Sequence, residues 1–269
     1  MTLRKPSVGF DMNSLAQDFD LLREAAREAA SLALSYQNRT VARERKPDGS
    51  VVTEVDKAVD SLLAARLKGA RPDYGWLSEE SCENERRLTA RRVWILDPID
   101  GTREFLHGGD SWTIALCLAE DGVPVLSAVV NPVRGEFFEA RAGEGAFLNG
   151  KRISASAQQE LSGARVVVSQ EALSKRKWQP PWPGAVPVAA NASIYRLALV
   201  ASGRADAYFA LNPKWEWDIA AGALLVSEAG GTVTGKSGAP LTFNSAEAKV
   251  ASVAAAAPAL HRLLIERLR

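Results

Sequence analysis

Cysteine, histidine, net charge and long apolar runs are all scarce in this chain. It has two cysteines, Cys82 and Cys117, and two histidines in 269 residues. So few cysteines are typical of a protein kept in a reducing compartment. A catalytic cysteine is not expected, because only two histidines could assist it. We therefore expect neither a disulfide framework nor thiol chemistry.

The charge balance and the hydropathy exclude two further classes of protein. Lysine and arginine total 33 and aspartate and glutamate total 32, so the net charge is +1. Such a chain has no general affinity for nucleic acid or for an anionic membrane surface, and any charged ligand must be bound by local groups. No run of about eighteen apolar residues occurs, and no apolar leader precedes the first helix. We predict a soluble, cytoplasmic protein with no nucleic-acid or membrane partner.

Two helices are predicted in the N-terminal part. Apolar side chains recur at helical spacing over residues 13–37. A polar stretch with a turn at residues 46–49 follows, and a second helix is predicted from about Thr53 to Lys68. Thr53 is its expected N-cap, with Asp56 three positions later, which is the spacing of a capping box.

A largely antiparallel sheet is predicted next. Residues 91–97 are a predicted strand, and residues 111–153 have the pattern of an antiparallel meander with turns at glycine and proline. After about residue 155, short strands alternate with helices, which is typical of an α/β unit. We predict an α+β fold with an antiparallel sheet in the first half and an α/β second half packed closely against it.

The stretch "WILDPIDGTREFL" ends a predicted strand in two aspartates, Asp97 and Asp100. Aspartate is uncommon at the end of a buried strand unless it is paired or binds a metal. The proline between them stiffens the backbone, so the carboxylates can converge. Gly101 and Thr102 then open a helix whose free amides attract an anion such as phosphate. Oxygen ligands of this kind suit Mg²⁺. The alternative is that Asp97 caps the turn and Asp100 caps the helix.

Two further groups of acids favour the metal site. "WLSEES" ends another apolar stretch in Glu79 and Glu80, and "WEWDIAAG" has Asp218 at the start of a helix. Each acid alone is more often solvated or a helix cap than a metal ligand. The three groups together are hard to assign to caps.

Together these stretches resemble the inositol monophosphatase family of metal-dependent sugar phosphatases over nearly the whole chain. "DPIDGT" is similar to the family's central motif, "WDIAAG" followed by "EAGG" to its C-terminal motif, and "DGSVVTEVD" to its mobile first loop and the next helix. The resemblance implies a layered αβαβα fold with two domains. An α+β domain at residues 1–155 would bind metal, and an α/β domain at residues 156–269 would complete the active site.

The resemblance also assigns roles to single residues. It implies hydrolysis of a phosphate monoester by a water molecule that two or three Mg²⁺ ions activate. Asp56 and Thr102 would, with Glu79, position and deprotonate this water, and the amides of Gly101 and Thr102 would hold the phosphate. The implied metal ligands are four side chains and one carbonyl group: Glu79, Asp97, Ile99 (carbonyl), Asp100 and Asp218. A homodimer and inhibition by lithium are implied in the same way.

One position departs from the family pattern, and the assignment of another is open. Ser78 stands where the family has a glycine before Glu79. The basic residue of the mobile loop is either Lys46 or Arg45.

The substrate is predicted from positions that differ between branches of the family. Members that take inositol phosphates usually have a glutamate where this chain has Ala210 or Leu211, and often an aspartate where it has Arg196. "DGTREF" is similar to the "DGTKEF" of relatives that hydrolyse 3'-phosphoadenosine 5'-phosphate. An arginine can hold a second phosphate through a bidentate contact. We predict this bisphosphate nucleotide as substrate, with Ser193 and Arg196 in its binding site.

Several alternatives stay open. Inositol 1-phosphate and histidinol phosphate are other possible substrates, and Arg196 could instead face solvent. A non-catalytic regulatory or binding protein on the same fold, or a structural protein whose acids are caps, would belong to a different functional class.

Overall fold

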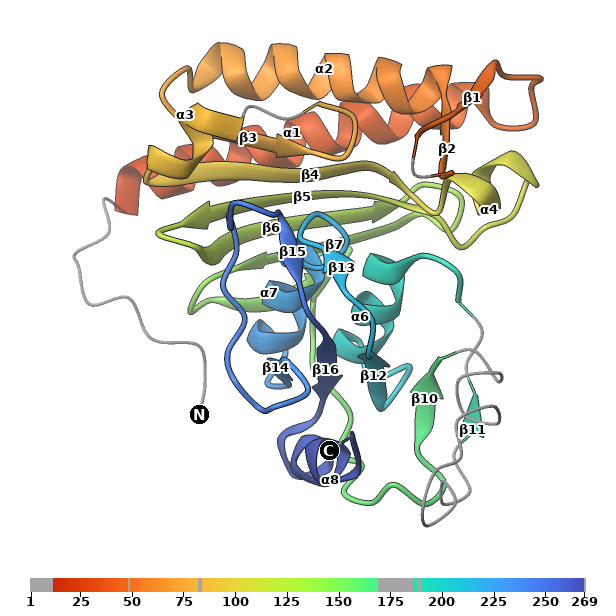
Figure 1. Cartoon of the computed structure of the whole chain (residues 1–269), viewed down its shortest axis with the longest axis vertical. Coiled ribbons are helices and arrows are strands. Elements are labelled where there is room, and N and C mark those ends of the chain that lie inside the picture. Colours follow the sequence, from red (N-terminus) through yellow and green to blue (C-terminus); the bar gives the residue numbers. More distant parts are fainter. Residues whose placement is uncertain (1–11, 48, 82–83, 169–185, 188–189, 269) are drawn as a thin grey trace.

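Helices and sheets alternate in layers in the computed structural model, which describes residues 12–47, 49–81, 84–168, 186–187 and 190–268 (Figure 1). Helices α1 (Met12–Tyr36) and α2 (Glu54–Ala70) cover one face of a seven-stranded sheet. Helices α6 (Ser193–Ala201) and α7 (Ala220–Glu228) lie between that sheet and a five-stranded sheet, whose outer face is covered by α8 (Pro258–Leu268). The predicted αβαβα layering is confirmed.

The seven-stranded sheet carries the predicted meander. Its order follows the sequence, and all pairs are antiparallel except β3 with β4. A short helix, α3 (Asn84–Thr89), links these two parallel strands. The strands are β3 (Gly75–Ser78), β4 (Arg92–Asp100), β5 (Thr113–Glu120), β6 (Val123–Asn131), β7 (Glu136–Arg141), β8 (Gly145–Leu148) and β9 (Lys151–Ile153).

The five-stranded sheet is mixed and its order does not follow the sequence. Strand β10 lies parallel to β11 and β12, whereas β16 is antiparallel to both β12 and β14. Its order is β11 (Val186–Pro187), β10 (Arg165–Val167), β12 (Ala207–Ala210), β16 (Val253–Ala256) and β14 (Thr232–Thr234). Residue 155 falls between the two sheets, and the division into two domains stays a prediction.

Two small ribbons complete the described strands. β1 (Arg43–Arg45) and β2 (Val51–Thr53) form an antiparallel hairpin before α2. β13 (Lys214–Trp215) pairs with β15 (Lys249–Val250) shortly before α7. Both ribbons lie next to residues that the sequence marks as functional.

Strand β4 is buried on both faces, which explains its almost continuous apolar sequence. Trp94 and Leu96 belong to the core under α1 and α2, whereas Val93 and Ile95 belong to the core that α6 and α7 share. This alternation is the period of two that a strand imposes. A strand held on both sides gives the aspartates at its end a rigid base.

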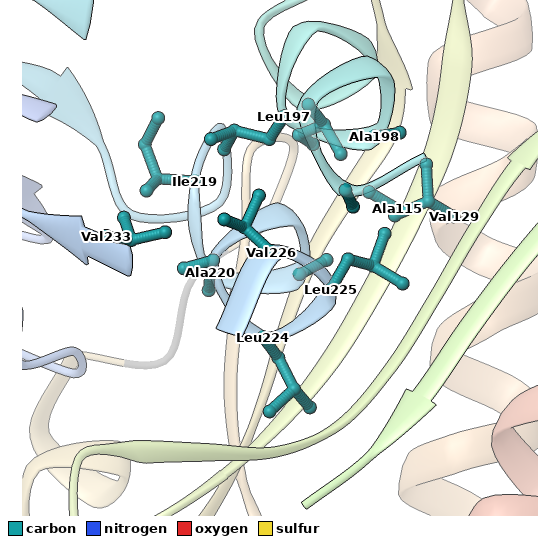
Figure 2. Packing of buried hydrophobic residues seen from close by; sticks show 14 of the residues in the cluster. Ala115, Val129, Leu197, Ala198, Ile219, Ala220, Leu224, Leu225, Val226 and Val233 are labelled. Carbon is teal, nitrogen blue, oxygen red and sulfur yellow. The ribbon is translucent and has the colours of Figure 1, made fainter. Parts of the chain in front are cut away.

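The helical layer between the sheets is tightly packed. Figure 2 shows Leu224, Leu225 and Val226 of α7 close to α6 and the sheets. A Cβ atom at Gly222 would lie 2.6 Å from Cβ of Leu197, so α6 and α7 approach too closely for any larger residue there. This layer fixes the starts of α6 and α7, which both face the end of β4.

Cys117, which is the one cysteine among the described residues, has no evident catalytic place. Cys117 lies on β5 and is fully buried, and burial raises the pKa of its thiol, which makes it a poor nucleophile. Cys82 lies outside the described residues. None of the described helices has the length and apolarity needed to cross a membrane.

Candidate active site

Three aspartates from distant parts of the chain meet at the end of β4. The pairing of β4 with β5 shifts register between Asp97 and Asp100, where Pro98 has no N–H to donate to a neighbouring strand. Asp218 follows β13 and precedes α7. One carboxylate oxygen from each of the three aspartates lies within 4.8 Å of the other two.

Asp97 has one carboxylate oxygen without a protein partner. Its side chain is 1% exposed, and Oδ1 has no hydrogen-bond partner among the described residues. Burial, followed by repulsion from Glu79, Asp100 and Asp218, raises the pKa of Asp97 well above its usual value. A buried carboxylate oxygen that faces other carboxylates is costly unless a cation joins them.

Asp100 caps a helix, although not the one that the sequence suggested. Its two oxygens accept hydrogen bonds from the amides of Ser193, at 3.0 Å, and Ile194, at 2.6 Å, at the start of α6. The helix that follows Asp100 directly, α4 (Thr102–Leu106), begins at Gly101 without a side-chain cap. The expectation that Asp100 could cap this helix is wrong, because its carboxylate turns toward α6. Burial raises the pKa of Asp100 to about 6, although the α6 amides and the charge of Arg196 oppose this effect.

Glu79 is held beside the aspartates by the β1–β2 hairpin. Lys46 Nζ lies 3.0 Å from Glu79 Oε1 and 2.7 Å from Glu80 Oε1, so Lys46 contacts both glutamates. This contact favours Lys46 over Arg45 as the basic residue of the loop. Burial alone would lower the pKa of Lys46, but the attraction of Glu79 and Glu80 outweighs it and raises the pKa. Burial raises the pKa of Glu80 to about 7 against the opposing effect of Lys46.

Thr102 and Asp56 form a hydrogen-bonded pair. The Thr102 hydroxyl donates to Asp56 Oδ1 at 3.0 Å. Asp56 Oδ2 accepts from the amide of Thr53 at 2.8 Å and also from its hydroxyl group, so the predicted capping box of α2 is confirmed. Burial raises the pKa of Asp56, and the hydrogen bonds from Thr53 and Thr102 oppose the increase. The helix cap thus orients the carboxylate that holds Thr102.

A pocket of about 510 Å³ opens over these groups. Gly101 turns the chain from β4 into α4 with φ at 97°, and a Cβ there would lie 3.2 Å from Cβ of Ala192. The first amides of a helix have no acceptor within it, and they lie in the wall of this pocket. The lining consists of Ser50, Val51, Glu79, Asp97, Ile99, Asp100, Gly101, Thr102, Arg103, Glu104, His107, Asn191 and Asp218.

Ser193 and Arg196 are not among the lining residues. The Arg196 Nε atom donates to the Ala190 carbonyl at 2.8 Å, and its guanidinium group lies 5.9 Å from the ring centre of Tyr208. Ser193 Oγ lies 3.5 Å from Lys214 Nζ. Arg196 is therefore a partly buried residue that supports the start of α6, and it is not a solvent-facing one.

Six lining residues were not predicted from the sequence as site residues: Ser50, Val51, Arg103, Glu104, His107 and Asn191. Glu104 Oε2 accepts a hydrogen bond from the side-chain Nδ2 of Asn191 at 2.7 Å, and the two residues are 87 positions apart in the chain. Arg103 and His107 lie on and directly after α4. The signal that was available for these two is their position within and directly after the short helix that Thr102 begins, while nothing local marks Asn191.

Acidification is expected to stabilise the metal-free protein. Burial and then repulsion by Asp100 and Glu79 raise the pKa of Asp218 to about 7, and the pKa of Asp100 is about 6, both above an ordinary value of 3.8. Between these values the folded state binds protons that the unfolded chain has released. The free energy of unfolding therefore decreases as the pH rises from about 4 to about 7.

Thermal unfolding in chelator between about pH 8 and about pH 5 measures this effect. The melting temperature of the wild type is expected to rise on acidification by more than that of Asp218→Asn, which lacks one titrating group. Parallel curves for the two proteins would contradict the repulsion described above.

Comparison with known proteins identifies the family. The inositol monophosphatase family matches residues 14–269 of the sequence. The chain belongs to the inositol monophosphatase family. One relative is a Nus factor SuhB of Xylella fastidiosa, which is 34% identical over 82% of both chains. Inositol monophosphatase 2 of Solanum lycopersicum is 33% identical over 81% of this chain and 87% of its own. A histidinol-phosphatase of Chlorobaculum parvum is 34% identical over 81% and 85%.

Solved structures of inositol monophosphatase family members share the fold. The extragenic suppressor protein suhB of Bartonella henselae superposes with a TM-score of 0.79 at 27% identity, over 94% of this chain and 98% of its own. The IMPase of Thermotoga maritima gives a TM-score of 0.78 at 27% identity, over 96% and 97%. The resemblance inferred from the motifs is confirmed, and the family membership supports a phosphatase without selecting among its substrates.

Proposed function

We propose that this protein is a Mg²⁺-dependent phosphomonoesterase that hydrolyses a small phosphorylated metabolite. The observation that carries the proposal is the cluster of Asp97, Asp100 and Asp218, with an unpartnered oxygen on Asp97. These aspartates share one pocket with Thr102, whose hydroxyl donates to Asp56. Carboxylates that only cap helices or face solvent would not have to be buried and clustered in this way.

The donor set fits Mg²⁺. The candidate ligands are oxygen atoms only, which Mg²⁺ prefers, and it is typically held by a few carboxylates together with a substrate phosphate. Burial and then mutual repulsion raise the pKa values of Asp97 and Asp218, and divalent cations would relieve the repulsion. The proposed ligands for two or three ions are Glu79, Asp97, the Ile99 carbonyl group, Asp100 and Asp218. When bound, such ions supply neutralisation of the phosphate charge and a lower pKa for water.

The protein groups around the cluster have separate tasks in this proposal. The Thr102 hydroxyl gives its hydrogen to Asp56 Oδ1, so its lone pairs can accept a hydrogen from the attacking water. Glu79 is the proposed acceptor of the proton, and Lys46 fixes its position through Oε1. The amides of Gly101 and Thr102 are proposed to bind the phosphate oxygens.

The substrate proposal is a bisphosphate, with 3'-phosphoadenosine 5'-phosphate as the specific candidate. It rests on the "DGTREF" stretch and on the absence of an acid at Ala210 and Leu211. Arg196, which was expected to hold the second phosphate, does not line the pocket and donates to the Ala190 carbonyl through Nε, so this role stays a prediction. Inositol phosphate and histidinol phosphate are the alternatives, because relatives at 33% and 34% identity carry the corresponding names.

Removal of divalent cations is expected to abolish activity. Phosphate release from a panel of these esters should require Mg²⁺ and disappear in excess EDTA. Because a ligand that binds only the folded state stabilises it, Mg²⁺ at about 100 times its dissociation constant should add about 2.7 kcal/mol to the free energy of unfolding. Full turnover in EDTA would rule out the metal-dependent mechanism.

A non-catalytic role is the second candidate, because a relative at 34% identity is named Nus factor SuhB. Stabilisation by Mg²⁺ without phosphate release from any ester of the panel would favour it. A homodimer and inhibition by lithium are proposed with the enzyme on the family resemblance, and a cytoplasmic location is proposed on the scarcity of cysteine.

A further inference from the structure

A second pocket lies directly beside the one that contains the aspartates. Its volume is about 570 Å³, and His107 lines both pockets. Residues 36–43, between α1 and the β1–β2 hairpin, form one wall, and the end of α4 forms the other. Figure 1 shows α4 next to this hairpin. The lining residues are Tyr36, Asn38, Arg39, Thr40, Val41, Arg43, Phe105, Leu106, His107 and Gly108.

The lining of this second pocket is basic and contains no carboxylate. Arg39 and Arg43 are exposed, and among the described residues neither guanidinium group is recorded in a hydrogen bond or an ion pair. His107 has Nδ1 2.7 Å from the Arg103 carbonyl oxygen, so Nδ1 carries the hydrogen and Nε2 is left for another partner. Asn38 and Thr40 add neutral polar groups. We call this cavity the basic pocket.

The negative ends of two helices point to the same region, but their carbonyl groups are occupied. At the end of α4, the carbonyl groups of Arg103, Glu104 and Phe105 accept hydrogen bonds from the amides of residues 107–109. At the end of α1, the carbonyl of Tyr36 accepts from the amide of Arg39. Such bonds satisfy the partial negative charge of a helix end. The carboxylate of Glu54 nearby accepts from the amide of Ala42 at 2.9 Å. The arginines therefore dominate the local charge.

We propose that the basic pocket binds a second phosphate of the same substrate molecule whose phosphate ester is hydrolysed at the aspartate site. This inference rests on the proposed function. Arg39 and Arg43 would each give charge-assisted hydrogen bonds to the second phosphate. A simple monoester occupies only the aspartate site, so the basic pocket selects bisphosphates.

Pairs of substrates that differ by one phosphate test this proposal. Adenosine 3'-phosphate is compared with 3'-phosphoadenosine 5'-phosphate, and fructose 1-phosphate with fructose 1,6-bisphosphate. The wild type is expected to prefer the bisphosphate in at least one pair. The preference is measured as kcat/KM for the bisphosphate divided by kcat/KM for the monophosphate. In the double variant Arg39→Gln/Arg43→Gln this ratio should fall by about 10-fold or more in that pair. Arg262→Gln, which removes one positive charge from an exposed position on α8, should keep the wild-type ratio.

The remaining outcomes separate the failure of this inference from that of the proposed function. An unchanged ratio in the double variant, with monophosphate turnover intact and a wild-type melting temperature, would overturn the second-phosphate site. If the wild type with Mg²⁺ hydrolyses none of the four esters and none of the wider panel, the proposed function fails and this inference with it.

Discussion

Asp97→Asn is expected to lower phosphate release by about 10³-fold or more and to remove the stabilisation by Mg²⁺. The substitution keeps the shape of a side chain that is 1% exposed but takes away its charge. Charge neutralisation at the reacting phosphate supplies several kcal/mol, and about 4 kcal/mol corresponds to roughly 10³-fold in rate. Steady-state phosphate release and thermal unfolding with and without Mg²⁺ measure both effects.

The same variant should be more stable than the wild type when no metal is present. In the wild type, burial and repulsion from Glu79, Asp100 and Asp218 disfavour the charged form of Asp97. Asparagine removes one partner of that repulsion. A loss of activity together with a higher metal-free melting temperature distinguishes a ligand from a residue that only supports the fold.

Asp206→Asn is the matched control. Asp206 is also buried, but it lies in the five-stranded layer and accepts two hydrogen bonds from the Arg165 side chain. Its replacement should lower the melting temperature and leave the rate unchanged, which is the opposite pattern. Retained Mg²⁺ stabilisation in Asp97→Asn would contradict its proposed role as a ligand.

The local sequence was enough to predict those helices and strands that interactions between nearby residues determine. The capping box at Thr53 and Asp56 depends on residues three positions apart, and the meander of β5–β9 is a series of neighbouring strands. The strand that leads to the acids was predicted from the apolar run before Asp97, although β4 continues to Asp100. In each case the physical signal lies within a few residues of the feature it specifies.

Contacts between distant segments could not be predicted in this way. Asp100 accepts its hydrogen bonds from residues 93 and 94 positions away, and Lys46 binds Glu79 across 33 positions. Arg196 has a charge that suits a phosphate, but its direction depends on how α6 packs against Tyr208. The basic pocket exists only because the end of α1 folds beside the end of α4. Such placements follow from tertiary packing and not from the spacing of residue types.

Thr102→Val is expected to lower the rate by about 10²-fold or more while the protein keeps its stabilisation by Mg²⁺. Valine has nearly the shape of threonine but no hydroxyl, so the hydrogen bond to Asp56 Oδ1, at 3.0 Å, is lost. The Thr102 hydroxyl cannot donate to the carboxylate and to water at once, so its partner fixes it as the acceptor from water. Thr102→Ser restores the hydroxyl and should recover most of the rate, which separates the chemical group from the packing of the side chain.

The effects of substituting Thr102 and Asp56 on the rate are not expected to be additive in a double-mutant cycle. Asp56→Asn weakens the acceptor that holds Thr102 and also disturbs the cap of α2, so it should cost both rate and stability. If Asp56 acts on the rate through Thr102, then Asp56→Asn adds little to the rate defect of Thr102→Val, although its stability cost is undiminished. Rate effects that multiply in the double variant would show that the two residues act independently. A loss of Mg²⁺ stabilisation in Thr102→Val as large as that in Asp97→Asn would contradict the division between water-positioning and metal-binding residues.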